Sequence, residues 1–197
     1  MQQFICSSHH WNFKISTVMK QVHPLNLIRQ LGGAAARKEE RRLLGLDVGD
    51  KYVGLALSDL DNKIASPFSV LLRKKSNLNL TLMASDFDSL ISLYSLKGFV
   101  IGIPWDRHRV SSDAVRIKSF VNDLSKTNML QGLPYTFWNE QFTSKNVELL
   151  LKPLNLNHPY HSKTILDKFA AVGILQGYLD YANRKINFQH HSHSDSS

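Results

Sequence analysis

The sequence predicts an α/β domain with helices on both faces of a mixed five-stranded sheet. Three short apolar runs, at residues 43–48, 52–58 and 64–72, follow one another and have the length of β-strands. Beyond them, segments with apolar residues at helical spacing alternate with two further strand-like runs. Successive strands followed by strand–helix alternation are typical of a mixed sheet with helices packed on its faces.

The first two runs are joined by a very short turn and form the stretch LLGLDVGDKYVGLALSD. Five of the six residues at 43–48 are apolar or Gly, which indicates a strand covered on both faces. The connection Gly49-Asp50-Lys51 is typical of a hairpin. Asp47 lies inside the first run, where a charge is costly unless something pairs with it. A metal or phosphate site would provide that partner.

The third run contains Pro67, which favours an edge strand or a β-bulge. Apolar residues at helical spacing then predict a helix over residues 78–96, and Gly98 is expected to end it. The apolar, β-branched run FVIGI at 99–103 predicts the fourth strand.

A helix is predicted next, with Ser112 as its N-cap. PYTFW at 134–138 predicts the fifth strand, and a short helix is expected over 143–151. A last helix is predicted over 165–182 after a polar loop. Residues 185–197 are rich in His and Ser, so a disordered tail is expected there.

Residues 1–42 show little core-forming pattern and contain no acid before Glu39, which indicates a leader or a disordered extension. This composition is compatible with a plastid or mitochondrial transit peptide; without one the protein would be cytoplasmic. Met19 is an alternative start. The single cysteine, Cys6, excludes an internal disulfide and fits a reducing compartment. No run approaches the ~18 apolar residues of a membrane span, so no membrane partner is expected.

The formal net charge of +8 suggests a nucleic-acid partner, but its distribution weakens this argument. Residues 1–38 contain five bases and no acid, whereas the chain from residue 43 onward contains 17 bases and 14 acids. The predicted domain is therefore only mildly basic.

Three carboxylates stand out because each interrupts an apolar context. Asp47 lies in the first strand, Glu140 follows the fifth strand, and Asp167 lies in the predicted first turn of the last helix. Small or apolar residues follow Asp167 at +3, +4 and +7, which directs it toward the sheet. Three acids that meet in one pocket repel one another unless divalent cations neutralise them.

Each carboxylate has an alternative explanation. Asp47 could cap the hairpin turn, and Glu140 could be an exposed loop acid. Asp167 follows Thr164 by three residues, which is the spacing of a helix capping box. The joint placement of the three acids at strand ends and a helix start favours the metal site.

At residues 43–181 the chain resembles the YqgF family, RuvX-like candidate Holliday-junction resolvases that are also described as pre-16S rRNA nucleases. LDVGDKYVGLALSD is similar to the opening D-x-G-x-x-x-x-G-x-A signature of the family, with Asp47 as its acid, and VIGIP resembles its V-G-x-P strand end. WNEQFTS resembles the D-E-R-x-[ST] motif, with Glu140 as the acid. LDKFAAVGILQGYL resembles the closing D-x-x-A-A-x-x-I-L-Q helix, with Asp167 as the acid.

The resemblance implies a ribonuclease H-like fold, with Asp47, Glu140 and Asp167 as catalytic residues that hold Mg²⁺ or Mn²⁺. It also implies a nuclease that acts on RNA during the processing of precursor ribosomal RNA, in ribosome biogenesis. Two rival hypotheses are a Holliday-junction resolvase that cuts branched DNA as a homodimer, and a non-catalytic RNA-binding or ribosome-assembly factor. The second rival is motivated by Asn139 and Gln141, where the family usually has Asp and Arg.

Four basic residues are candidate contacts to nucleic-acid phosphates. Lys51 lies in the hairpin turn, Arg107 and Arg109 lie in the loop WDRHRV, and Lys145 follows WNEQFTS. A phosphate contact of this kind makes binding salt-dependent. Trp105, at the start of the same loop, could stack on a base or pack over the sheet end.

Overall fold

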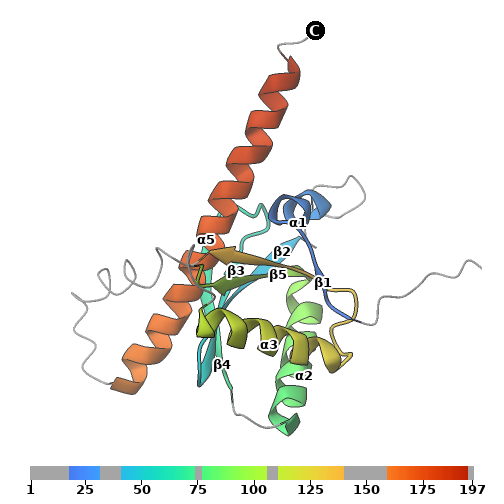
Figure 1. Cartoon of the computed structure of the whole chain (residues 1–197). Coiled ribbons are helices and arrows are strands. Elements are labelled where there is room, and N and C mark those ends of the chain that lie inside the picture. The colour runs from blue at the N-terminus through green and yellow to red at the C-terminus, as the bar shows by residue number, and fades with distance from the viewer. Residues whose placement is uncertain (1–17, 32–40, 74–76, 106–110, 140–158, 195–197) are drawn as a thin grey trace, which may run out of the picture.

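The computed structural model describes residues 18–31, 41–73, 77–105, 111–139 and 159–194, which form a mixed sheet with helices on both faces (Figure 1). The sheet has six strands in the order β1-β6-β5-β2-β3-β4. The strands are β1 (Lys20–Gln21), β2 (Arg42–Val48), β3 (Tyr52–Ser58), β4 (Ala65–Leu72), β5 (Leu96–Ile103) and β6 (Pro134–Asn139). The helices are α1 (Pro24–Leu31), α2 (Asn77–Tyr94), α3 (Ser112–Lys126) and α5 (Pro159–Ser194).

Strand directions divide the sheet into two parts. β2, β3 and β4 are antiparallel neighbours, whereas β2, β5, β6 and β1 run parallel to one another. The parallel strands β2, β5 and β6 therefore end at one edge, near Val48, Ile103 and Asn139, which we call the carboxyl edge. The predicted mixed sheet with helices on both faces is confirmed, with β1 as an additional strand.

Alternating side chains of the strands contribute to two separate cores, as the period of two in a strand requires. On one face, α2 and α3 cover an apolar core that includes Leu44, Leu46, Val53, Phe87, Phe99 and Phe120. On the other face, α5 and α1 cover a second core that includes Leu43, Ala56, Val100, Ile174, Leu175 and Tyr178. The long helix α5 crosses this second face (Figure 1).

Pro67 was expected to lie in an edge strand or at a β-bulge, and both expectations are confirmed. β4 is the edge strand beside β3, and the β3–β4 register shifts between Leu55 and Ala56, opposite Ser69 and Pro67. A proline has no backbone N–H to donate, so a bulged edge strand accommodates it at little cost.

Three predicted boundaries were wrong. α2 ends at Tyr94 and β5 begins at Leu96, because Ser95 adopts a left-handed conformation with φ 54°, whereas Gly98 lies inside β5. Ser111, rather than Ser112, caps α3: its hydroxyl accepts a hydrogen bond from the Asp113 amide at 3.2 Å.

The last helix was predicted too short at both ends. α5 begins at Pro159 and continues to Ser194, through most of the segment that was predicted to be a disordered tail. The sequence contains neither Gly nor Pro after Gly177, and extending an existing helix is far easier than starting one. The short helix expected over 143–151 lies outside the described residues.

Residues 18–31 are part of the fold, although no folded element was predicted before residue 43. Gln21 of β1 pairs with Tyr135 of β6, and the amide of Val22 donates to the Tyr135 carbonyl at 2.8 Å. In α1, Leu27 is fully buried, and the Tyr178 hydroxyl of α5 donates to the Pro24 carbonyl at 2.8 Å. The two-residue strand is too short to give a periodic signal. The helix does carry one, because Pro24 stands at its first position and Leu27, Ile28 and Leu31 lie on one buried face, but this signal was overlooked. Within the described residues, no helix has both the length and the apolarity of a membrane span.

We predict that Leu27→Ala lowers the free energy of unfolding by about 2–5 kcal/mol, because truncation leaves a cavity between α1 and the sheet. Urea denaturation measures this change. Leu93→Ala is the matched control, because Leu93 is 73% exposed and its truncation removes little buried area. Equal stability of the two variants would show that α1 is not docked on the domain.

Candidate active site

Asp47 lies within β2 and faces α5. It is the register partner of Gly54 on β3, and it shares its face of the strand with Leu43 and Gly45. The neighbouring positions Leu46 and Val48 point into the opposite core. The side chain of Asp47 is half-buried. Asp47 is therefore the second-to-last residue of β2 and pairs within the β2–β3 ladder, so it does not belong to the turn itself.

Asp167 packs directly against β2 and β3, because α5 lies unusually close to these two strands. A Cβ atom built on Gly45 would lie 2.7 Å from Leu175 Cβ and 3.0 Å from the Ala171 carbonyl oxygen. One helical turn earlier, a Cβ atom on Gly54 would lie 2.1 Å from the carbonyl oxygen of Asp167. Positions 167, 171 and 175 are spaced by four, so they form one stripe along α5 that contacts the glycines of β2 and β3.

Asp47 and Asp167 are brought together through Gly54. Gly54 is opposite Asp47 in the β2–β3 ladder, and its backbone contacts that of Asp167. The Oδ2 atom of Asp167 is buried although its side chain as a whole is only half-buried. Asp47 and Asp167, which lie 120 residues apart in the sequence, therefore both adjoin Gly54, one across the β2–β3 ladder and the other from α5.

The capping-box alternative for Asp167 is wrong. α5 begins at Pro159, so both Thr164 and Asp167 lie within the helix rather than at its N-terminus. The prediction that Asp167 lies in the first turn of its helix is wrong for the same reason. The inward direction predicted for Asp167 is confirmed, because the residues at +3 and +4, Ala170 and Ala171, are buried.

The third predicted carboxylate, Glu140, lies outside the described residues, as do Arg107, Arg109 and Lys145. The residue before it, Asn139, ends β6 and pairs with Ile103 at the end of β5. This places the last described residue of β6 at the carboxyl edge.

Among the basic residues that were predicted to contact phosphates, Lys51 is described. It is exposed in the β2–β3 turn, at the same edge of the sheet as Asp47.

Carboxylate oxygens are the ligands that Mg²⁺ and Mn²⁺ prefer, so Asp47 and Asp167 fit a divalent metal by the chemistry of their donor atoms. The described residues alone contain no cluster of three or more His, Cys, Asp or Glu side chains able to hold a metal ion. A site with three protein carboxylates would need a further ligand from the part of the chain that is not described.

Two amide side chains of α5 fix its position along the sheet, and sequence reasoning assigned neither of them a role. Gln176 accepts a hydrogen bond from the Ala65 amide at 2.8 Å and donates to the Lys63 carbonyl at 2.9 Å. Asn183 donates to the Asn62 carbonyl at 2.8 Å. These contacts hold α5 to the β3–β4 connection, and because the helix is rigid they also determine where Asp167 lies.

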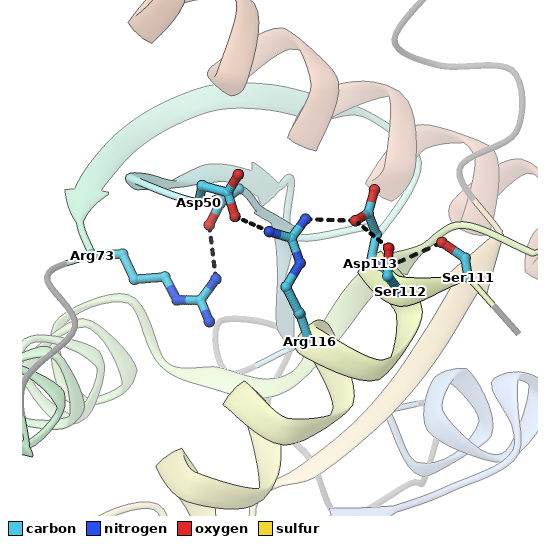
Figure 2. A network of polar contacts seen from close by, with 7 residues as sticks. Asp50, Arg73, Ser111, Ser112, Asp113 and Arg116 are labelled. Atoms are coloured by element: carbon cyan, nitrogen blue, oxygen red, sulfur yellow. Dashed lines mark hydrogen bonds and ion pairs between the residues drawn. The ribbon is translucent and has the colours of Figure 1, made fainter.

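A network that we call the turn clamp holds the β2–β3 turn from two sides (Figure 2). Arg116 of α3 forms ion pairs with Asp50 of the turn and with Asp113, the latter at 2.5 Å. Arg73, which follows β4, donates from Nη1 to the Gly49 carbonyl at 2.9 Å. The turn immediately follows Asp47 and Val48, so the clamp fixes the end of the strand that carries the carboxylate.

Arg73 is the better shielded member of the turn clamp. Its guanidinium lies 4.8 Å from the centre of the Phe120 ring, and its amide donates to the Lys51 carbonyl at 2.7 Å. Partial burial lowers the pKa of Arg73, and the nearby Asp50 carboxylate opposes this change. Arg116 and Asp50 are both more than half exposed, and exposed ion pairs contribute only ~0–1 kcal/mol. The hydrogen bond of Arg73 is therefore expected to contribute more to the rigidity of the turn.

Known proteins resemble this chain in sequence and in structure. The family model described as RuvX: Holliday junction resolvase matches residues 41–181. A candidate pre-16S rRNA nuclease of Lachnospira eligens is 33% identical over 71% of this chain and 96% of that protein. One of Zymomonas mobilis subsp. mobilis is 34% identical over 83% of this chain and 92% of that protein. Among solved structures, Thermus thermophilus RuvC covers 72% of this chain and 96% of that chain, at 12% identity and a TM-score of 0.47.

We predict that Gly54→Ala lowers the free energy of unfolding by about 1–3 kcal/mol, because the added methyl group meets a backbone atom of α5 that cannot rotate away. Thermal or urea unfolding measures the change. Gly177→Ala is the control on the same helix: its Cβ would lie 3.2 Å from the Trp138 side chain, and alanine favours a helix by ~1 kcal/mol over glycine. A Gly54→Ala protein as stable as Gly177→Ala would refute the close contact.

We predict that Arg73→Leu destabilises the protein by about 1–2 kcal/mol and loosens the β2–β3 turn, because the Gly49 carbonyl loses a charged donor. Hydrogen exchange gives the local readout: the Gly49 amide, which donates to the Tyr52 carbonyl at 2.9 Å, should exchange faster while that of Leu46 is unchanged. Lys185→Leu, at an exposed position of α5, is the control. Unaltered exchange at Gly49 would contradict the clamp.

Proposed function

The chain belongs to the RuvX family, and from this premise we propose that it is a metal-dependent nuclease that hydrolyses phosphodiester bonds in precursor ribosomal RNA. The names of the relatives from Lachnospira eligens and Zymomonas mobilis support the choice of substrate. The description of the family, Holliday junction resolvase, supports branched DNA as the second candidate substrate.

The observation that carries the proposal is the meeting of Asp47 and Asp167 through Gly54. Burying part of two carboxylates side by side is unfavourable, because like charges at short range raise the free energy of the ionised pair. A bound divalent cation would offset this cost. In the proposed site, Asp47, Asp167 and Glu140 hold Mg²⁺ or Mn²⁺.

When bound, divalent ions at such a site activate water and stabilise the leaving oxygen of a phosphodiester. Asp47 supplies its carboxylate from a rigid central strand, and Asp167 supplies its own from a helix that is hydrogen-bonded to the β3–β4 connection. Lys51, Arg107, Arg109 and Lys145 are proposed to contact phosphates of the substrate.

We predict that the purified protein cleaves precursor 16S rRNA in Mg²⁺ or Mn²⁺ and that Asp47→Asn or Asp167→Asn abolishes cleavage. The loss should exceed the ~10- to 100-fold effect that removal of an outer-shell metal partner has. Gel analysis of end-labelled transcripts measures the rate. Asp88→Asn, at an exposed position of α2, is the matched control. Cleavage that persists in the Asp47→Asn protein or in excess chelator would refute the carboxylate site.

Metal binding has a readout that does not depend on cleavage. Mn²⁺ at 100 times its dissociation constant should raise the free energy of unfolding by about 2.7 kcal/mol, and Asp47→Asn should lose this increment. Four-way DNA junctions in the same cleavage assay test the second substrate, together with sedimentation for the homodimer that symmetric cutting needs. Tight RNA binding without metal-dependent cleavage would instead identify a non-catalytic binding factor.

A further inference from the structure

A large cavity lies beside α3 and around the β1 edge of the sheet, and neither Asp47 nor Asp167 is among the described residues that line it. Its volume is about 1230 Å³, and it is bordered by α3, by β6, by the segment around β1 and by the residues that follow β5. We call it the α3 cavity. Drug-sized ligands occupy sites of ~300–1,000 Å³, so the α3 cavity has room for a larger molecule.

The floor of the α3 cavity is aromatic. Tyr135 and Phe137 of β6 line it, and their rings meet edge to face with centroids 5.5 Å apart. Both side chains are half-buried. Trp105 lies at the rim and is 63% exposed, although a large aromatic side chain is usually well covered. Aromatic faces of this kind are surfaces on which unpaired bases stack.

One wall of the α3 cavity carries positive charge. Lys118, Asn122 and Lys126 of α3 line it at intervals of four residues, which places successive side chains about 6 Å apart along the helix. Lys126 forms an ion pair with Asp123 at 3.1 Å, whereas Lys118 forms none with the described carboxylates. The lining residues that the structure describes include two lysines and one histidine but no Asp or Glu. This wall therefore complements a polyanion.

The α3 cavity also reaches the carboxyl edge. Ile103, at the end of β5, lines it and pairs with Asn139, the residue before Glu140. β2, which carries Asp47, is two strands away from β6. Neighbouring strands are ~4.8 Å apart, so β6 and β2 are about 10 Å apart within the sheet. Because Asp47 faces α5 on the other face, a strand that joins the cavity to the carboxylate has to pass around this edge. A few nucleotides of an extended strand span such a distance.

We propose that the α3 cavity binds an unpaired RNA segment that flanks the cleavage position, with bases on Trp105, Tyr135 and Phe137 and phosphates beside Lys118 and Lys126. The proposal rests on the proposed nuclease function and specifies which part of the substrate the protein recognises. A duplex is excluded because its bases are stacked on one another and cannot reach the aromatic floor. The cavity thus selects substrates with a single-stranded stretch next to the cleavage position.

The chain's own N-terminal segment is the rival occupant, since Val18 lines the α3 cavity and residues 1–17 precede it. Those residues contain a lysine and no acid, so their charge does not complement the cationic wall. RNA is therefore the better match.

Binding to a fluorescent single-stranded RNA of ten nucleotides, measured by anisotropy in chelator on the full chain, tests the proposal. We predict that Trp105→Ala weakens binding by about 5- to 100-fold and that Trp105→Phe restores most of it. Lys118→Ala should weaken binding and reduce the slope of log affinity against log salt by about 0.7. Lys185→Ala, which removes the same charge from exposed α5, should change the slope less, and a matched RNA duplex should bind all variants equally weakly.

Lysine acetylation locates the RNA directly. Bound RNA should protect Lys118, and not Lys185, from acetylation. Cleavage of RNA in Mg²⁺ is measured in a separate assay. Unchanged binding by Trp105→Ala and Lys118→Ala in a protein that still cleaves RNA would overturn this inference alone. If the wild-type protein binds RNA but does not cleave it, and Trp105→Ala and Lys118→Ala both lose binding, the inference is supported and the proposed nuclease activity is rejected. If Lys118 is already protected from acetylation relative to Lys185 in the absence of RNA, the chain's own N-terminal segment occupies the cavity. This result would overturn the inference.

Discussion

The close contact between α5 and the glycines of β2 and β3 is the constraint on which the site depends. Gly45 and Gly54 leave no room for a side chain beneath Ala171 and Asp167. If either glycine carried a side chain, the helix would have to move outward, and the Asp167 carboxylate would move with it. The contact therefore closes the core on one face of the sheet and also places Asp167 beside the strand pair that carries Asp47.

Further contacts reduce the freedom that this packing leaves. Gln176 and Asn183 prevent α5 from sliding along its axis, because they bind backbone groups of residues 62–65. At the other end of the sheet, Arg73 holds the turn that follows Asp47. Apolar packing alone is weakly directional. Polar contacts at both ends of the sheet therefore fix the positions of α5 and β2 relative to each other.

Much of this arrangement was predictable from sequence because it follows local periodicity. Two apolar runs with a short turn predicted β2 and β3 to the residue at three of their four ends, and Pro67 predicted an edge strand or a β-bulge, both of which occur. Asp47 and Asp167 were recognisable as charges in apolar surroundings. The roles of Gln176 and Arg73 were not predictable, because their partners are backbone carbonyls and amides, which leave no pattern in sequence. β1 escaped notice because two residues have no periodicity and its partner strand begins at Pro134.

The strand order has a consequence for when the protein becomes complete during its synthesis. Lys20, near the start of the chain, pairs with Pro134, and Asp47 needs a helix that begins at Pro159. Chains emerge from the ribosome at ~5–20 residues per second. β1 and β2 are therefore synthesised several seconds before β6 and α5. Until α5 has emerged and docked, Asp47 lacks its neighbouring acid. A nascent chain that has not yet released α5 from the ribosome therefore lacks one of the two described acids of the proposed nuclease site.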